Sequence, residues 1–214
     1  MIINTFLFDF DGTVADTIPG ILITLKKTRK AMAVSYDLDT AKSLIGIPLV
    51  SMGAALCGEK RASEFVETYR KEYNYWGADK ISFFPGMEKL LRDLNNAGMS
   101  CAVVTSKRRD SLLNNIEKLK AHDYFDLLVT KESVSHFKPH PEAVEYALTG
   151  LNCEAKHAVM IGDTRYDIGC GQGAKVRTIA VTWGTEPKES LLKCRPDDIV
   201  DSAEQLYDLC FSLI

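Results

Sequence analysis

Residues 6–14 read Phe-Leu-Phe-Asp-Phe-Asp-Gly-Thr-Val, an apolar run with strand character that stops at two acids. Gly12 permits a tight turn at this point, because it lacks the Cβ atom that restricts other residues. Residues two apart in a strand share a face, so Asp9 and Asp11 point the same way if the strand continues, although the turn can redirect Asp11. The pattern therefore brings two carboxylates to the end of a buried strand, the edge of a parallel sheet at which ligands bind.

Two carboxylates this close repel each other, which favours either protonation of one or a cation between them. Mg2+ suits such a site, because it prefers oxygen ligands from one or two carboxylates together with substrate phosphate and water. The alternative interpretation is a strand end capped by polar residues, since Asp-Gly is a common turn dipeptide. This segment alone favours neither interpretation over the other.

The composition of the 214-residue chain is that of a globular protein with one large domain, or with a core and a small insert. Hydrophobic residues make up 46% and charged residues 26% of the chain, which argues against disorder. The net charge of -3 gives no basic excess to attract nucleic acid or an anionic membrane. The first apolar run is too short to span a membrane and lacks the features of a secretory signal. We therefore expect a cytoplasmic protein with no nucleic-acid or membrane partner.

The cysteines and histidines give no metal signature. The six cysteines include no Cys-x-x-Cys pair, and we expect reduced thiols that pack in apolar runs. The spacing of the histidines is not typical of metal ligands, so none is assigned to a metal: His122, His136, His140 and His157.

Strand and helix patterns alternate along most of the chain, which predicts an α/β fold with a parallel, helix-covered sheet. A block of helical patterns interrupts this alternation after the first strand, and insertions of this kind often form lids. We therefore predict a core domain of residues 1–14 and 84–214 and a helical cap domain of residues 15–83. Further strands are expected at residues 100–104, 124–129, 157–161, 178–181 and 199–200.

Polar residues recur where the predicted strands end. Asp9 and Asp11 follow the first strand, Thr105 follows residues 100–104, and Asp163 follows residues 157–161. Each of these residues alone could simply end a strand or cap a helix. Packing alone does not explain why all of them stand at the same end of their strands.

Four separated motifs resemble those of the haloacid dehalogenase superfamily, in the same order and at strand ends. They occupy residues 9–14, 104–106, 138–139 and 162–167. The similarity covers nearly the whole chain, including the helical insert, and is to the phosphoglycolate phosphatase-like branch. It implies a Rossmann-like core with an inserted α-helical cap.

The resemblance implies a phosphatase that forms an aspartyl-phosphate on Asp9. Asp11 would be the general acid that protonates the leaving oxygen and then the base that activates water. Thr105 would hydrogen-bond the transferring phosphoryl group, while Lys138 would hold phosphate and orient Asp9. A carboxylate nucleophile divides hydrolysis into two easier displacements, and a positioned acid and base contributes roughly 10²–10⁴-fold.

The resemblance also implies a Mg2+ cofactor and a small phosphorylated metabolite, such as a phosphoglycolate-type monoester, as substrate. Asp9, the backbone carbonyl of Asp11 and Asp163 would bind the metal, and Asp167 would bind or support it. The phosphate site would consist of Gly12, Thr105, Ser106 and Lys138.

Several alternatives remain within this fold. Asp11 favours a phosphatase or phosphomutase, because similar pumps place a threonine there and dehalogenases lack an acid at this position. Alternative enzymes are an inorganic pyrophosphatase, a nucleotidase and a sugar-phosphate phosphatase or phosphomutase. A regulatory binding protein on this fold is the non-enzymatic alternative, although such proteins usually lack a catalytic acid. We expect a monomer or a homodimer.

Further expectations concern residues around the site. Residues 46–49 form a loop that faces the site in members with this cap. Lys107, Arg108 and Arg109 are interpreted as a solvated helix start rather than a substrate clamp. Lys175 stands where the family has a left-handed glycine, so this turn is expected to be strained or differently shaped. An aromatic set is interpreted as the core of the lid: Phe65, Tyr69, Tyr73 and Trp76.

Overall fold

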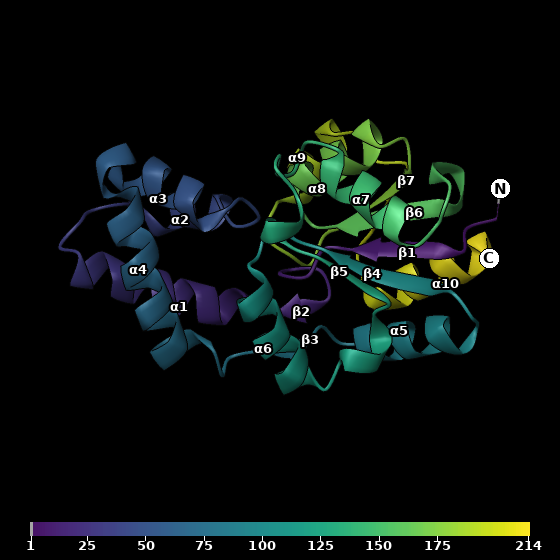
Figure 1. The fold of residues 1–214 in the computed structure, drawn as a ribbon, viewed down its shortest axis with the longest axis horizontal. Coiled ribbons are helices and arrows are strands. Elements are labelled where there is room, and N and C mark those ends of the chain that lie inside the picture. The colour runs from purple at the N-terminus through teal and green to yellow at the C-terminus, as the bar shows by residue number, and fades with distance from the viewer. Residues whose placement is uncertain (1) are drawn as a thin grey trace.

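The computed structural model describes residues 2–214 and consists of two parts, a sheet-based body and a helical insert, at the right and left of Figure 1. The body contains a six-stranded sheet in the order β5-β4-β1-β6-β7-β8, in which all neighbouring strands are parallel. The predicted α/β class with a Rossmann-like sheet is therefore confirmed. The strands span Thr5–Phe8 (β1), Ser100–Val104 (β4), Leu127–Val129 (β5), Ala158–Gly162 (β6), Arg177–Val181 (β7) and Asp198–Val200 (β8).

Strand β1 lies at the centre of the sheet because it is apolar on both faces. Phe6 and Phe8 belong to the apolar core on one side of the sheet and Leu7 to the core on the other. The chain builds β4 and β5 on one side of β1 and then returns to place β6 on the other. This reversal opens a crevice at the carboxyl end of β1, the usual position of ligands in open α/β sheets.

Helices cover both faces of the sheet, as Figure 1 shows. Helices α5, α6 and α10 pack on the face of Phe6 and Phe8, and α7 and α8 pack on the face of Leu7. Helix α9 packs beside α8 through a small separate cluster. The helices span Met87–Asn96 (α5), Arg109–Leu119 (α6), Glu142–Gly150 (α7), Arg165–Gly173 (α8), Lys188–Lys193 (α9) and Ala203–Leu213 (α10). Short 3-10 turns occupy His122–Tyr124 (η3), Lys131–Ser133 (η4) and Ala155–His157 (η5).

The helical insert has an apolar core of its own, separate from the two cores of the sheet. Phe65, Tyr69 and Tyr73 stack in succession, with ring centroids 6.1 and 5.9 Å apart, and their side chains are buried as predicted. Trp76 differs from the expectation, since it is 39% exposed and lies under the ammonium group of Lys27. The elements are α1 (Ile18–Ala31), α2 (Leu38–Ser43), α3 (Leu49–Cys57), η1 (Glu59–Arg61), α4 (Ala62–Glu72) and the π-helical turn η2 (Tyr73–Gly77).

Two short strands connect the insert to the body. Strand β2 (Ala15–Asp16) pairs antiparallel with β3 (Ser82–Phe83), so the two connecting segments lie side by side. The sequence predicted helices with little strand in this region, because a two-residue strand is too short to produce an alternating pattern. The structure therefore adds a small ribbon at the place where the chain leaves and re-enters the body.

The remaining local differences are small. Tyr124 lies in η3 rather than at the start of β5, which is shorter than predicted. Lys175 adopts a φ of 61°, so this turn keeps the left-handed conformation without a glycine. The cysteines are free thiols throughout residues 2–214. In the same part of the chain, no helix has both the length and the apolar composition needed to cross a membrane.

Candidate active site

The turn after β1 brings the first motif against the fourth. Gly12 adopts a φ of +91°, and a Cβ atom at this position would lie 2.5 Å from Oδ2 of Asp163. The hydroxyl of the next residue, Thr13, donates a hydrogen bond of 3.0 Å to Oδ1 of Asp163. Glycine is therefore required at position 12 both for the backbone conformation and for the close approach of the carboxylate.

The ammonium group of Lys138 is buried and fully hydrogen-bonded. It donates to Oδ1 of Asp9 at 2.6 Å, to Oδ1 of Asp167 at 2.5 Å and to the carbonyl oxygen of Val104 at 3.1 Å. Burial opposes the charged form, but Asp167 and Asp9 outweigh it and raise the pKa of Lys138. Because an ammonium group has three donors, this lysine orients Asp9 and would have to exchange one partner to bind a phosphate.

The carboxylates of Asp9, Asp163 and Asp167 form a buried cluster in which one oxygen of each lies within 4.8 Å of the others. Burial raises the pKa of Asp9 well above its usual value, although Lys138 opposes this shift. Burial and then Asp167 raise the pKa of Asp163 to about 6. Lys138 pairs with Asp9 and Asp167 but not with Asp163, so the three carboxylates carry more negative charge than this one cation compensates. These residues fit a hard divalent cation such as Mg2+.

Backbone and hydroxyl groups fix the two carboxylates of the fourth motif. Oδ2 of Asp163 accepts hydrogen bonds from the backbone N–H and the hydroxyl of Thr185, at 2.7 and 2.8 Å. Oδ2 of Asp167 accepts from the backbone N–H and hydroxyl of Thr164, at 3.0 and 2.6 Å, in a capping box that begins α8. Sequence reasoning missed the contacts of Thr13 and Thr185 with Asp163. Polar residues directly follow β7, as they follow β1, β4 and β6, and this pattern in the sequence could have identified Thr185 as a residue near the site.

The side chain of Asp11 lies outside this cluster. Its Oδ1 accepts hydrogen bonds from Nζ of Lys107 and from the hydroxyl of Thr17, both at 2.6 Å. Burial opposes the charge of Lys107, but the Asp11 carboxylate outweighs it and raises the pKa of this lysine. The interpretation of Lys107 as a solvated residue is therefore wrong, since its side chain is only 11% exposed. The side chain of Arg108 is 41% exposed and pairs with Asp110. This residue therefore agrees better with the predicted solvated helix start.

The second motif contributes two hydroxyl groups. Thr105 directly follows β4, and its hydroxyl oxygen accepts a 3.2 Å hydrogen bond from the backbone N–H of Lys107. The hydroxyl of Ser106 is buried and has no hydrogen-bond partner among the described residues. A buried polar atom left unpaired costs about 1–3 kcal/mol, so this hydroxyl marks a place for a ligand oxygen or a water molecule.

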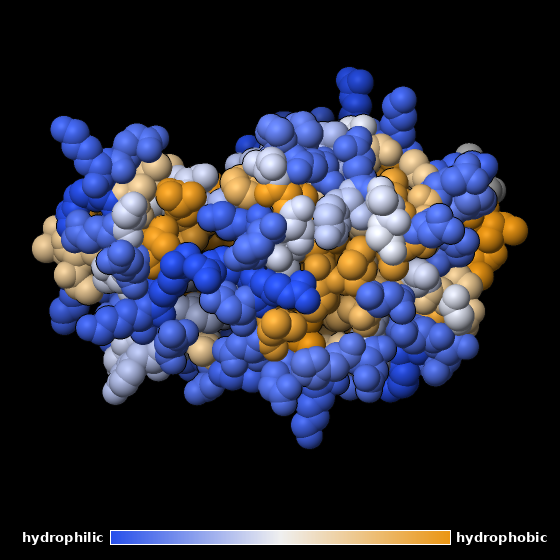
Figure 2. All heavy atoms as spheres, in the orientation of Figure 1, coloured by the Kyte–Doolittle hydropathy of each residue, from blue (hydrophilic) through white to orange (hydrophobic). Residues whose placement is uncertain are grey.

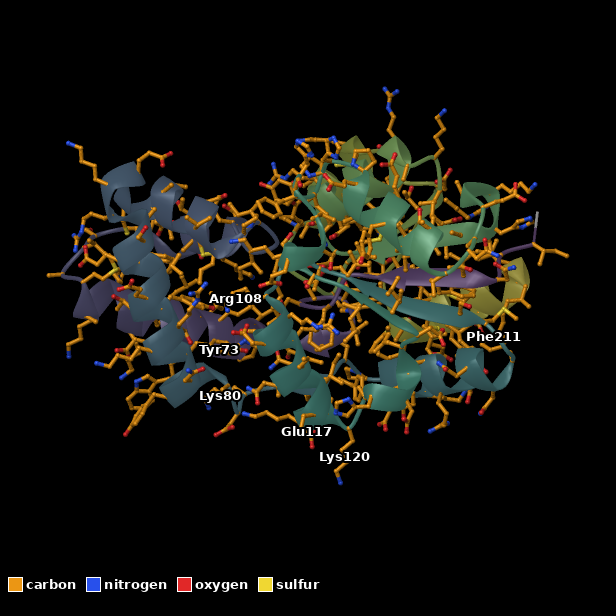
Figure 3. All side chains as sticks on the ribbon, viewed as in Figure 1. Tyr73, Lys80, Arg108, Glu117, Lys120 and Phe211 are labelled. Atoms are coloured by element: carbon orange, nitrogen blue, oxygen red, sulfur yellow. The ribbon has the colours of Figure 1, made fainter. Side chains whose placement is uncertain are left out.

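A cavity of about 160 Å³ lies between the insert and the carboxyl edge of the sheet. Figure 2 shows apolar and strongly hydrophilic surfaces meeting at this junction. Figure 3 labels Tyr73 of the insert and Arg108 of the body, which both line the cavity. The polar floor comes from the body and the largely apolar roof from the insert, including the loop of residues 46–49 predicted to face the site. The floor residues are Asp9, Asp11, Thr105, Ser106 and Lys107.

The parallel sheet, the two acids after its central strand and the buried lysine together define a hydrolase of the haloacid dehalogenase type. A family model for haloacid dehalogenase-like hydrolases matches residues 6–181. The chain therefore belongs to this family, as the four sequence motifs predicted.

Relatives and solved structures agree with this assignment. The chain is 31% identical over 210 residues to the pyrophosphatase PpaX of Oceanobacillus iheyensis, with 98% of this chain and 97% of the relative covered. It superimposes on a predicted phosphatase from Clostridium acetobutylicum with a TM-score of 0.89, 28% identity and complete coverage (100%) of both chains. A haloacid dehalogenase-like hydrolase from Streptococcus pneumoniae gives a TM-score of 0.86 and 28% identity, with 97% and 98% covered. The chain is an enzyme that groups with the phosphatases of its family.

Proposed function

We propose that the chain is a Mg2+-dependent phosphatase that hydrolyses a small phosphorylated metabolite through an aspartyl-phosphate on Asp9. The observation that supports this proposal most is the buried Asp9 carboxylate at the end of β1, held through Oδ1 by Lys138 at 2.6 Å. The second oxygen of Asp9 would attack phosphorus while the bond from phosphorus to the leaving oxygen breaks. Asp11 would give its proton to that oxygen. It would then take a proton from the water that attacks phosphorus and releases Asp9.

Asp9, Asp163 and the backbone carbonyl of Asp11 are the proposed Mg2+ ligands. When bound, Mg2+ would neutralise charge on the phosphoryl oxygens. Asp167 is held by the ammonium group of Lys138 through Oδ1 and by Thr164 through Oδ2, whereas Asp163 accepts, within residues 2–214, only from the uncharged donors of Thr13 and Thr185. This difference favours a supporting role for Asp167. The hydroxyls of Thr105 and Ser106 and the turn at Gly12 would bind the phosphoryl group.

The proposed division of the chain is a core domain of residues 1–14 and 84–214 and a cap domain of residues 15–83. The separate apolar core of the insert supports this division. The β2–β3 ribbon lies at both proposed boundaries and would act as the hinge. Closure of the cap over the cavity would exclude water and let the cap select the substrate.

The charges around the cavity favour a substrate with a second anionic group. Lys107, Arg108, Arg70 and Lys131 all line the cavity, beyond the groups proposed to bind the transferring phosphate. Phosphoglycolate carries a carboxylate in addition to its phosphate, and inorganic pyrophosphate carries a second phosphate. Pyrophosphate is the second candidate because the relative in Oceanobacillus iheyensis is a pyrophosphatase.

A phosphate-release screen tests the proposal. Purified protein with Mg2+ is incubated with phosphoglycolate, pyrophosphate, nucleoside monophosphates and sugar phosphates, and the substrates are ranked by kcat/KM. We expect the two substrates with a second compact anionic group to rank first. Excess EDTA should abolish release and added Mg2+ should restore it. Turnover that is indifferent to chelation would contradict the metal role, and an isomeric phosphate product without free phosphate would indicate a mutase.

Lys107→Met is expected to lower kcat/KM by about tenfold to a hundredfold, because a charge-assisted hydrogen bond to Asp11 contributes about 1.5–3 kcal/mol. Lys107→Arg keeps a cationic donor and should recover part of the loss, which loss of packing alone would not predict. Arg109→Met is the matched control, since Arg109 is an exposed cation two residues away. If Lys107→Met and Arg109→Met lower kcat/KM equally, Lys107 does not act by orienting Asp11.

A further inference from the structure

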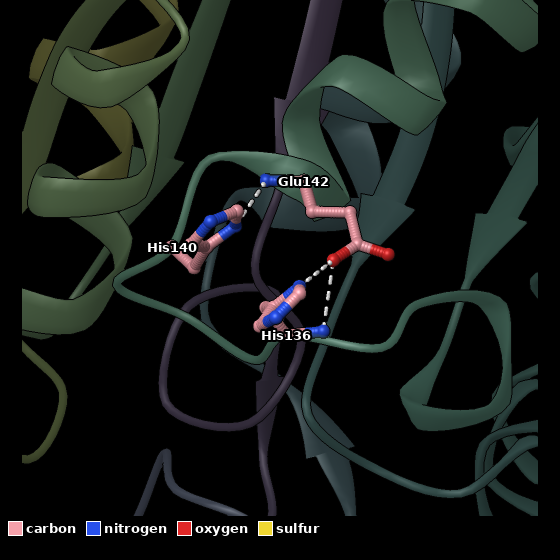
Figure 4. Close-up of side chains that lie close together, drawn as sticks. All are labelled: His136, His140 and Glu142. Carbon is pink, nitrogen blue, oxygen red and sulfur yellow. Dashed lines mark hydrogen bonds and ion pairs between the residues drawn. The ribbon is translucent and has the colours of Figure 1, made fainter.

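A second group of potential metal ligands lies outside the cavity, on the loop that leads into α7. His136, His140 and Glu142 each place one ligand atom within 4.8 Å of the other two (Figure 4). The spacing of these histidines did not predict that they lie together, because their proximity depends on the conformation of the loop. Within residues 2–214, the other such group is the buried cluster of Asp9, Asp163 and Asp167.

Hydrogen bonds orient the carboxylate of this group before any metal is bound. Oε1 of Glu142 accepts from the backbone N–H of Ser135 at 2.7 Å. Oε2 accepts from the backbone N–H of His136 at 2.8 Å and contacts Nδ1 of the same histidine at 2.7 Å. Backbone donors of this kind fix the direction of a ligating carboxylate and strengthen metal sites.

The two imidazole rings face each other beside this carboxylate. The ring centroids of His136 and His140 are 4.6 Å apart, with an interplanar angle of 30°. The backbone N–H of Glu142 donates to Nδ1 of His140 at 3.3 Å, so the second ring also lies against the residue that supplies the carboxylate. Pro139 and Pro141 flank His140 and limit the conformations of its backbone.

The donor set selects the type of metal. Imidazole nitrogen suits Zn2+, Cu2+ and Ni2+, whereas Mg2+ prefers oxygen ligands. Bonds of about 2.0–2.1 Å in a tetrahedral site place ligand atoms roughly 3.4 Å apart. The three ligand atoms are close enough to reach this spacing by rotation of the two exposed histidine side chains.

We propose that His136, His140 and Glu142 bind a transition-metal dication such as Zn2+, with the remaining coordination positions open to water. The site differs from the buried carboxylate cluster in its residues and in its donor atoms, so the proposal does not depend on the proposed function. His136 and His140 stand two residues before and two residues after Lys138. An ion held by both histidines would therefore restrict the conformation of the loop that carries Lys138.

Zn2+ binding measured by competition with a chromophoric chelator tests the site. The parent protein for this experiment carries Asp163→Asn and is kept in excess Mg2+. Both conditions prevent the buried carboxylates from adding to the number of Zn2+ ions bound per chain. We expect one Zn2+ per chain, and we expect His136→Ala and His140→Ala to weaken binding at least tenfold. About tenfold is the lower limit for loss of a partner that only orients a metal ligand. All variants should keep the melting temperature of the parent, because both histidines are exposed.

His122→Ala is the matched control. Nε2 of His122 contacts Oε2 of Glu117 at 2.7 Å, the same separation as between His136 and Glu142, but this pair belongs to no three-ligand group in the described chain. Zn2+ affinity should therefore be unchanged in this variant. A parent protein that binds no Zn2+, or histidine variants at positions 136 and 140 that bind as tightly as the parent, would overturn the proposal. A Cu2+ spectrum that shows two coordinating nitrogens in the parent and one in His140→Ala would support it.

Discussion

Asp9→Asn is expected to lower kcat by roughly 10⁴–10⁶-fold, the range found when one member of a catalytic triad is removed from a hydrolase. The amide cannot form the acyl phosphate, and the remaining groups can only bind and polarise the substrate. Phosphate release under saturating substrate and Mg2+ measures the effect. Intact-protein mass spectrometry of rapidly quenched samples should show an added phosphoryl group in the parent protein and none in the variant.

The fold of this variant should be intact, which separates a chemical defect from unfolding. Burial raises the pKa of Asp9, so the ionised carboxylate is unfavourable at this position in the absence of metal. Asparagine has a similar shape and no charge, and Lys138 keeps its contacts with Asp167 and with the Val104 carbonyl. We therefore expect a melting temperature equal to or above that of the parent in EDTA.

A carboxylate at the opposite end of the sheet provides the control for Asp9→Asn. Asp126 accepts a hydrogen bond from the backbone N–H of Cys101, near the start of β4 and away from the cavity. Asp126→Asn makes the same chemical change there and should leave turnover unaffected. Full turnover in Asp9→Asn would show that the nucleophile has been assigned to the wrong residue.

The fold could be predicted because its signals are local in sequence. The apolar run before Asp9 and the continuous run of residues 100–104 indicate strands buried on both faces, and helical patterns separate the strands. Parallel strands then bring their carboxyl ends to one edge, which was enough to predict that Asp9, Thr105 and Asp163 converge. The β2–β3 ribbon could not be predicted, because two residues carry no periodicity.

The partners of the site residues depend on contacts between distant segments. Lys107 stands 96 residues from Asp11 in the sequence, and a lysine followed by two arginines has the local pattern of a solvated helix start. Thr13 reaches across 150 residues to Asp163. Such pairs follow from the way strand ends and turns are placed in space. A single sequence therefore indicates which motifs meet but not which side chain holds which.

Lys138→Met is expected to destabilise the metal-free protein by about 3–5 kcal/mol, the usual effect of removing one partner from a buried ion pair. The change leaves the carboxylates of Asp9 and Asp167 without their shared cation, in a site where both are almost completely buried. For a chain of this size, a loss of 1 kcal/mol lowers the melting temperature by roughly 2–4 °C. Thermal and urea denaturation in EDTA measure the effect.

A surface lysine gives the control for Lys138→Met. Lys89 pairs with Asp93 at 2.9 Å on α5, but the lysine side chain is 57% exposed. Water and salt screen this pair, so Lys89→Met should change the melting temperature little. If both variants melt at the same temperature as the parent, the buried ion pair has no role in stability.

The double variant Asp9→Asn with Lys138→Met separates the loss of charge balance from the loss of packing. Removal of one carboxylate leaves Asp167 as the only acid that has lost the shared ammonium group. The double variant should therefore be more stable than Lys138→Met alone, and the two changes should not be additive, because the side chains are in contact. Added Mg2+ should also stabilise Lys138→Met more than it stabilises the parent, since a bound cation would compensate the same excess of negative charge. Additive effects of the two substitutions would mean that Lys138 stabilises the site through packing rather than through its charge.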